Sequence, residues 1–206
     1  MIELVKSSVV FSEENHTYFL GEKQLKGITG MISRQLFPNK YKDIPEYILK
    51  RAAEKGSRIH GQCQFADVTG LPPESIEAIN YIRERLNAGY KAFANEYTVS
   101  DNEYFASNID CVWEKDEKIS LVDIKTTASL DREYLSWQLS IYAYLFELQN
   151  PLIKVDKLFG IWLRGDKSEL VEIERKPDAE VKRLLECEIN GEHFLPNAPV
   201  PADGKP

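Results

Sequence analysis

Two apolar segments of the chain each contain an aspartate, and a lysine lies two residues beyond the second one. Asp110 follows Ile109, whereas Asp123 and Lys125 alternate with apolar residues from Leu121 onwards. Side chains at positions i and i+2 of a strand share one face, so Asp123 and Lys125 point the same way. If a hairpin pairs the two strands, Asp110 lies beside Asp123, and adjacent carboxylates repel each other unless a cation lies between them. We therefore expect a Mg²⁺ or Mn²⁺ site beside a lysine, which suits hydrolysis of a phosphodiester.

Two further polar pairs lie on predicted helices. Gly56 and His60 are one helical turn apart, and so are Gln138 and Tyr142, which places each pair on one side of its helix. Other interpretations stay open on sequence grounds. An Asp-x-Lys pair is commonly a solvated strand face, and a single histidine is more often a satisfied core residue than a ligand. The apolar neighbours of Asp123 favour function, because charged residues are rare in a central strand.

The periodicity of the apolar residues predicts an α/β or α+β domain with a mixed central β-sheet flanked by helices. An N-terminal β-hairpin and a short helix are expected first, and an antiparallel meander later in the chain. The expected strands are 9–11, 17–20, 96–99, 104–107, 109–113, 119–125, 158–163 and 170–173. The expected helices are 31–36, 45–65, 132–148, 178–189 and one opened by Pro72 and Pro73, with Ile76, Ile79, Leu86, Tyr90 and Phe93 at helical spacing.

The domain organisation follows from this element order. We expect a single domain over residues 1–195, with the hairpin and short helix in 1–40 and the catalytic core in 94–165. Residues 196–206 contain four of the ten prolines and are predicted to form an extended or disordered tail.

The composition excludes several classes of protein. The chain has 206 residues, 43% of them hydrophobic and 11% aromatic, which is enough for a core and argues against disorder. The absence of a long apolar run or signal peptide predicts a soluble cytoplasmic protein with no membrane partner. Cys63, Cys111 and Cys187 form no CxxC pair, so we expect reduced buried thiols and no iron–sulfur cluster. A net charge of −7, taken alone, argues against a nucleic-acid partner.

The order of the motifs resembles the PD-(D/E)XK nuclease superfamily, specifically its RecB-like branch with phage-type and mitochondrial genome-maintenance exonucleases. The motifs are GxxxH at Gly56 to His60, an acid at Glu96, Asp110, Asp123-Ile124-Lys125, and QxxxY at Gln138 to Tyr142. The resemblance covers about residues 9–165, because the stretch from Phe11 to Thr29 also resembles phage-type members. It implies a restriction-endonuclease-like core.

The resemblance also implies a role for each matching residue. Asp110 and Asp123 would bind Mg²⁺ or Mn²⁺ together with the backbone carbonyl of Ile124, and His60 would complete the set of ligands. Lys125 would position the attacking water and steady the scissile phosphate.

Three other positions are less tightly defined by the resemblance. Gln138 and Tyr142 would support the site and contact DNA near the cleaved bond. Glu96 is either a ligand, a group behind the ligands, or a strand-face carboxylate. Gln64 stands where many relatives have an acid one turn after the histidine, so the number of metal ions stays open.

A basic segment precedes the histidine. Residues 40–58 contain six Lys or Arg and three acids, and Arg51, Lys55 and Arg58 are predicted to bind DNA phosphates on the way to His60. An ordinary solvated helix face is the alternative. The aromatic residues around Tyr142 either stack on bases or belong to the core.

These observations predict a divalent-metal-dependent DNA exonuclease that hydrolyses phosphodiester bonds with metal-activated water. The resemblance implies a bacterial or phage-encoded enzyme of DNA recombination, repair or phage replication, which acts on linear ends, single- or double-stranded. A recombinase, helicase or single-strand-binding protein is the expected protein partner. Two alternatives stay open: a structure-specific or restriction-like endonuclease, and a catalytically idle module that binds DNA or a partner.

Overall fold

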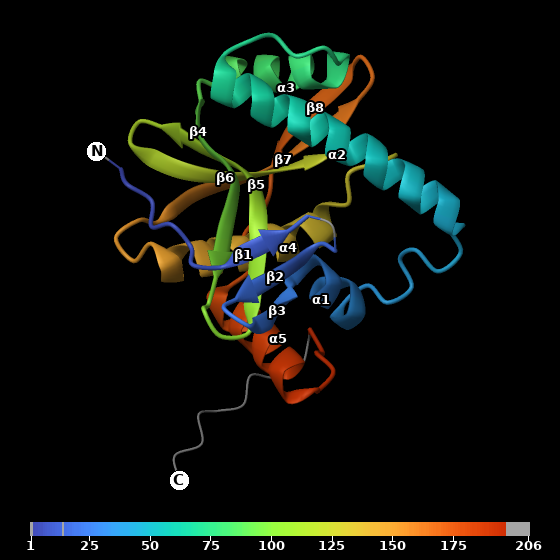
Figure 1. Cartoon of the computed structure of the whole chain (residues 1–206), viewed down its shortest axis with the longest axis vertical. Coiled ribbons are helices and arrows are strands. Elements are labelled where there is room, and N and C mark those ends of the chain that lie inside the picture. The colour runs from blue at the N-terminus through green and yellow to red at the C-terminus, as the bar shows by residue number, and fades with distance from the viewer. Residues whose placement is uncertain (1, 14, 197–206) are drawn as a thin grey trace.

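An eight-stranded mixed sheet forms the centre of the molecule in the computed structural model, which describes residues 2–13 and 15–196 (Figure 1). The strands are β1 (Val10–Ser12), β2 (Thr17–Leu20), β3 (Lys23–Gly27), β4 (Lys91–Ser100), β5 (Phe105–Lys115), β6 (Lys118–Lys125), β7 (Val155–Arg164) and β8 (Lys167–Glu172). The helices are α1 (Ile28–Gln35), α2 (Glu46–Thr69), α3 (Ile76–Asn87), α4 (Arg132–Gln149) and α5 (Asp178–Asn190). The mixed α/β class predicted from the sequence is confirmed, and the N-terminal hairpin is β1 with β2.

Strand β5 joins the two parts of the sheet, because it pairs with three other strands. Its first residues run parallel to β3, and the rest of the strand lies between the antiparallel strands β4 and β6. Strand β6 then runs parallel to β7, and α4 makes the crossover that a parallel pair needs. Residues 119–124 of β6 are at most 2% exposed, so a charged residue in this strand is surrounded by protein.

Helices cover both faces of the sheet. Helices α1, α4 and α5 pack on one face in a core that includes Leu121 and Leu139, whereas α2 and α3 pack on the other face around Ile59 and Trp113. Figure 1 shows α2 and α3 together at the top of the molecule and α1, α4 and α5 below the centre of the sheet. A residue of the central strands can therefore contact side chains from helices on both faces of the sheet.

The structure corrects one predicted strand boundary and adds one strand that was not predicted. The runs 104–107 and 109–113 form one continuous strand, β5, because Asn108 fits within the sheet and accepts a hydrogen bond from the Thr98 hydroxyl at 2.8 Å. Strand β3 was not predicted, since its sequence is polar. It nevertheless has a structural role, because it connects the hairpin to β5.

Helix α3 is shorter than predicted, and its apolar spacing does not mark its buried face. It ends at Asn87, and Gly89, with φ of +80°, turns the chain towards β4, so Tyr90 and Phe93 lie outside the helix. Ala78 and Tyr81 are fully buried. The regularly spaced side chains are instead exposed, at 46% for Ile76, 44% for Ile79 and 61% for Leu86.

No helix in the described part of the chain is long and apolar enough to cross a membrane. The predicted proline-rich tail, residues 196–206, lies outside the described residues except for Pro196.

Candidate metal centre

His60 lies on α2 and faces two central strands, β5 and β6. Its Nδ1 atom lies 3.6 Å from Oδ1 of Asp110, and its Nε2 atom lies 3.0 Å from the carbonyl oxygen of Ile124. Both neighbours are acceptors, so the imidazolium, with a proton on each nitrogen, fits this position best. Burial acts to lower the pKa of His60, but the Asp110 carboxylate outweighs it and raises the pKa to about 9.

Asp110 lies where β5 and β6 separate. The ladder between these strands ends at Cys111 and Val122, and beyond it the backbone N–H of Ile124 donates to Oδ2 of Asp110 at 2.7 Å. The carboxylate thus replaces a backbone acceptor at the point where the strands part. Burial acts to raise the pKa of Asp110, but the neighbouring His60 lowers it overall, so the group is ionised.

Glu96 has an uncommon backbone conformation for its residue type. Its φ is +47°, in the left-handed region, although it lies within β4 between Asn95 and Tyr97, which both pair with β5. A residue with a Cβ atom loses about 1–2 kcal/mol in this conformation, and such outliers concentrate at functional sites. Burial and the charge of Asp110 raise the pKa of Glu96 to about 7.

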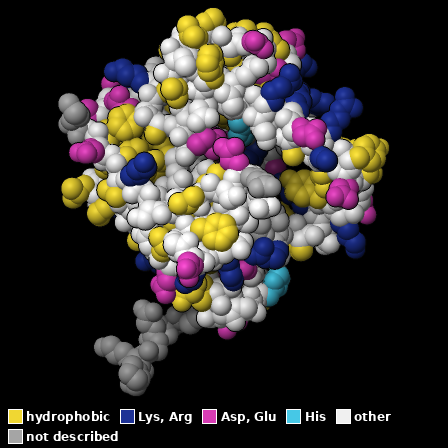
Figure 2. All heavy atoms as spheres, in the orientation of Figure 1, with side chains coloured by type: hydrophobic (Ala, Val, Ile, Leu, Met, Phe, Trp, Pro, Cys, Tyr) yellow, Lys and Arg dark blue, Asp and Glu magenta, His cyan; other side chains and the backbone are white. Residues whose placement is uncertain are grey.

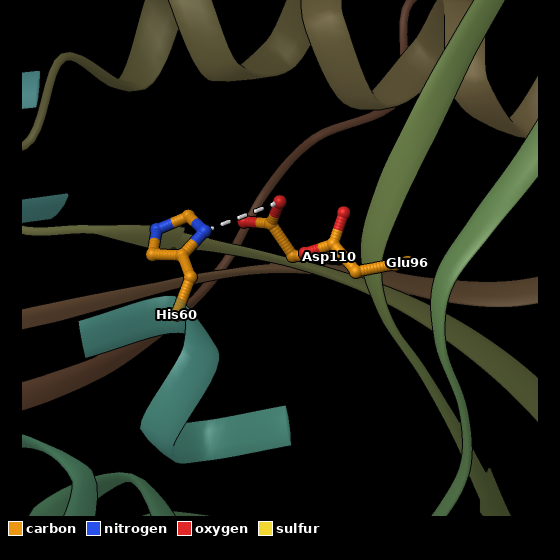
Figure 3. Close-up of side chains that lie close together, drawn as sticks. All are labelled: His60, Glu96 and Asp110. Atoms are coloured by element: carbon orange, nitrogen blue, oxygen red, sulfur yellow. Dashed lines mark ion pairs between the residues drawn. The ribbon is translucent and has the colours of Figure 1, made fainter. Parts of the chain in front are cut away.

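His60, Glu96 and Asp110 converge from α2, β4 and β5, as Figure 3 shows. One potential ligand atom from each residue lies within 4.8 Å of the other two. Two carboxylates and an imidazole suit Mn²⁺, and Mg²⁺ prefers oxygen ligands alone. The raised pKa values of His60 and Glu96 mean that protons neutralise this group in the absence of a cation. The residues therefore fit a divalent cation, which would bind in exchange for these protons.

Asp123, also predicted to be a ligand, is not one of these three residues, but it interacts electrostatically with Asp110 and His60 and pairs with the lysine. It is 2% exposed, its Oδ2 atom lies 2.6 Å from Nζ of Lys125, and its Oδ1 atom accepts from Nε2 of Gln138 at 2.6 Å. The prediction that Asp123 and Lys125 share one strand face is confirmed. Burial raises the pKa of Asp123 to about 6, although Lys125 acts to lower it.

The carbonyl of Ile124, also predicted to be a ligand, contacts His60. A ligating histidine commonly donates its second ring N–H to a backbone carbonyl, which fixes the orientation of the ring. The 3.0 Å contact from Nε2 of His60 to this oxygen has that arrangement, and it leaves Nδ1 directed at Asp110. This oxygen therefore orients the His60 ring, and its role as a metal ligand stays a prediction.

Gln138 fixes the lysine from the opposite layer, on α4. Its Oε1 atom accepts from Nζ of Lys125 at 3.2 Å, and its Nε2 atom lies 2.9 Å from the Tyr142 hydroxyl. Ser107 on β5 donates to the same hydroxyl at 3.0 Å, and no sequence motif marks this serine. Tyr142 is only 2% exposed, so it supports Gln138 from inside the protein and does not reach the surface for the predicted DNA contact.

The predicted DNA-binding cations do not lie beside His60. Arg51 and Arg58 precede it by nine and two residues, which at about 100° per residue places both roughly on the opposite side of α2. The Lys55 ammonium lies 3.2 Å from the Glu77 carboxylate on α3, so part of its charge is compensated within the protein. Proximity along the chain does not put these side chains beside His60, because a helix turns through half a revolution in about two residues.

Basic side chains nevertheless gather over α2, beside a hollow between this helix and the N-terminal hairpin (Figure 2). Acidic and histidine side chains are visible at the hollow in the same view. Lys50 is rotated by only about 80° from His60 around the helix axis, so of the four cations on α2 it points closest to the His60 side.

Comparison with known proteins adds little to this geometry. No family model matches the chain, and no curated protein is significantly similar to it in sequence. Among solved structures, the crystal structure of SSO0001 aligns with a TM-score of 0.49 and 18% identity over 84% of this chain and 78% of that chain. A similarity of this size carries no argument about activity.

Proposed function

We propose that the protein is a divalent-metal-dependent deoxyribonuclease of the PD-(D/E)XK type, acting as an exonuclease on DNA ends. The observation that carries the proposal is the meeting of two charged groups where β5 and β6 separate. One is the His60, Glu96 and Asp110 group, and the other is the Asp123 and Lys125 pair held by Gln138. The exonuclease assignment rests on the sequence resemblance described above.

His60, Glu96 and Asp110 would hold the cation, and Mn²⁺ is the better match to their nitrogen and oxygen donors. When bound, the cation supplies positive charge against the phosphate in the transition state. Asp110 is fixed for this role by the Ile124 N–H, and His60 by the Ile124 carbonyl. The ligands are thus oriented by the backbone of β6, the strand that also carries Lys125.

Lys125 is suited to electrostatic stabilisation and to orienting a water molecule. Burial acts to lower its pKa, but Asp123 and Asp110 raise it overall, so the side chain stays protonated and is not a general base near neutral pH. An ammonium group has three N–H donors, and Asp123 and Gln138 take two of them. The third can reach a phosphate oxygen or a water molecule, because the Lys125 side chain is 24% exposed.

We also propose that the protein acts in DNA recombination, repair or phage replication, which is the role that the sequence resemblance implies. A net charge of −7 is compatible with this role, because a bound divalent cation reverses the local sign of the acidic group. Binding to DNA would then be sensitive to salt and dependent on metal. A recombinase, helicase or single-strand-binding protein remains the proposed partner class.

The proposal is tested with the purified full chain, end-labelled linear DNA and closed circular DNA, in Mg²⁺, Mn²⁺ or EDTA. We expect metal-dependent loss of the linear substrate, and loss of this activity in Asp123→Ala and Lys125→Ala. Lys118→Ala is the matched control, because this lysine begins the same strand but is 64% exposed and pairs with Asp156. Cleavage that persists in both site variants would overturn the proposal, and cutting of circular DNA would identify an endonuclease.

A further inference from the structure

A second carboxylate on α2 lies two helical turns beyond His60, fully inside the protein. The side chain of Asp67 is 0% exposed, and three residues from two other elements surround it. Oδ1 lies 3.1 Å from Nη2 of Arg85 on α3. Oδ2 accepts from the Tyr81 hydroxyl at 2.6 Å and from Nδ2 of Asn95 on β4 at 2.9 Å. A buried carboxylate with this many partners is expensive to disturb, because each partner would lose its acceptor.

The Asp67 network reaches both strands that carry the candidate ligands. Asn95 is paired with Cys111 in the β4–β5 ladder, and its Nδ2 atom also lies 3.6 Å from the Cys111 sulfur. Asn95 immediately precedes Glu96, and Cys111 immediately follows Asp110. The network therefore holds the direct chain neighbour of each acidic ligand.

The Tyr81 hydroxyl extends this network into the core. It has a single proton, which the 2.6 Å contact assigns to Asp67, so it accepts from Nε1 of Trp113 at 3.1 Å and contacts the Cys111 sulfur at 3.2 Å. Trp113 is fully buried on the same strand as Asp110. Helix α2, helix α3 and strands β4 and β5 are thus connected through one carboxylate.

We propose that Asp67 is the positioning residue that sets the separation of His60 from Glu96 and Asp110. Asp67 and His60 are seven residues apart, which is about two turns, so they lie on nearly the same side of α2 and share its rigid backbone. Any shift of Asp67 relative to Asn95 moves the histidine relative to the two carboxylates. The same contact anchors β4 at the residue before Glu96, which supports the left-handed conformation at that position.

This inference rests on the proposed function where it concerns metal binding, and on contacts within the protein where it concerns the positions of the strands. The test therefore has two arms. In the first, Mn²⁺ binding to the full chain is measured by calorimetry for wild type and Asp67→Asn. We expect affinity to fall about ten- to one-hundred-fold, the effect typical of residues that orient metal ligands.

Glu188→Gln is the matched control for the first arm. Glu188 is also a buried carboxylate with ion pairs, to Lys26 at 3.2 Å and Arg34 at 2.7 Å, but it joins α5 to β3 and α1 on the other side of the molecule. This variant should lose stability without losing Mn²⁺ affinity. Equal losses of affinity in both variants, or no loss in Asp67→Asn, would overturn the inference.

The second arm needs no metal. Hydrogen exchange at the backbone amides of residues 95–97 should accelerate in metal-free Asp67→Asn, and the buried Cys111 thiol should become reactive to a thiol reagent. The partly exposed Cys187 is the internal reference. Unchanged exchange and an unreactive Cys111 would overturn the inference, even if wild type bound no Mn²⁺ and the proposed function had failed.

Two further variants keep the test decisive if Asp67→Asn folds poorly. Asn95→Ala removes only the contact to β4, leaves Arg85 and Tyr81 paired, and should reproduce most of the loss in affinity. The exchange variant Asp67→Asn with Asn95→Asp reverses donor and acceptor across the same contact. It should recover much of the lost affinity, and a failure of both expectations would overturn the positioning role.

Discussion

The two halves of helix α2 differ in how much of their surface is buried. Residues 46–54 are all exposed except the half-buried Leu49, and this part of the helix projects beyond the sheet at the right of Figure 1. From Ile59 onwards the helix buries Ile59, Cys63 and Ala66 against the sheet and α3. The second half also contains His60, with both ring nitrogens in contact with the strands.

Two isoleucines show that the difference depends on what covers each half of the helix. Ile48 precedes Ile59 by about three helical turns and lies on the same side of α2, yet it is 44% exposed while Ile59 is fully buried. The buried second half of α2 holds the candidate ligand His60 in place. The uncovered half presents Tyr47, which is 73% exposed, and a series of cations to solvent. One helix thus combines a rigid site with an accessible surface, and the following predictions test that division.

The largest effect is expected in the buried second half of α2. His60→Ala should lower DNA cleavage roughly one-hundred-fold or more, since even residues that only orient ligands contribute that much to metal affinity. High Mn²⁺ concentrations should restore part of the activity. The control is His193→Ala, the same change at an exposed position, which should leave cleavage unchanged. Equal activities in the two variants would remove His60 from the site.

A matched pair of isoleucines tests stability across the same helix. Ile59→Ala should lower the free energy of unfolding by about 2–5 kcal/mol, because it leaves a cavity in a fully buried position. Ile48→Ala, at a largely uncovered position, should change it by no more than about 0.5 kcal/mol. Urea denaturation of both variants gives the comparison. Similar losses would mean that the first half of α2 is covered in solution.

Affinity for Mn²⁺ should increase with pH. The pKa of His60 is raised to about 9, so proton binding stabilises the metal-free fold below about pH 6.5, and this contribution is lost as pH rises through 9. A cation that displaces this proton should bind up to about tenfold more tightly per pH unit within that window. Calorimetry at several pH values, in two buffers of different ionisation enthalpy, measures the released proton. Affinity independent of pH would contradict a ligand role for His60.

The smallest effect is expected in the exposed first half of α2. Lys50 and Arg51 are adjacent, but only Lys50 lies towards the His60 side of α2. Lys50→Gln should weaken DNA binding several-fold and reduce the slope of log affinity against log salt by about one, as loss of one phosphate contact does. Arg51→Gln should change both quantities less. The reverse order would indicate that DNA follows the outer side of the helix.

Strand alternation made part of the site predictable. The side chains of Asp123 and Lys125 meet because residues two apart share a strand face, and the apolar neighbours correctly indicated a buried central strand. The convergence of His60 and Asp110 was expected only through the resemblance, because they are fifty residues apart and belong to different elements. No local rule relates the side of a helix to the end of a particular strand.

Two features could not be obtained from sequence patterns. The left-handed conformation of Glu96 depends on its neighbours in β4 and β5, since glutamate has no intrinsic preference for it. The set of partners that holds Asp123 is also a tertiary effect. Lys125 and Gln138 both contact this carboxylate, and Gln138 comes from the opposite layer.

The strained backbone of Glu96 has a consequence for how this protein would evolve. A glycine at position 96 would adopt the same φ without steric cost, so the fold alone favours losing this side chain. Selection for thermal stability in a laboratory library, without selection for activity, should therefore enrich Glu96→Gly early. Glutamate should be retained at this position only where activity is selected together with stability.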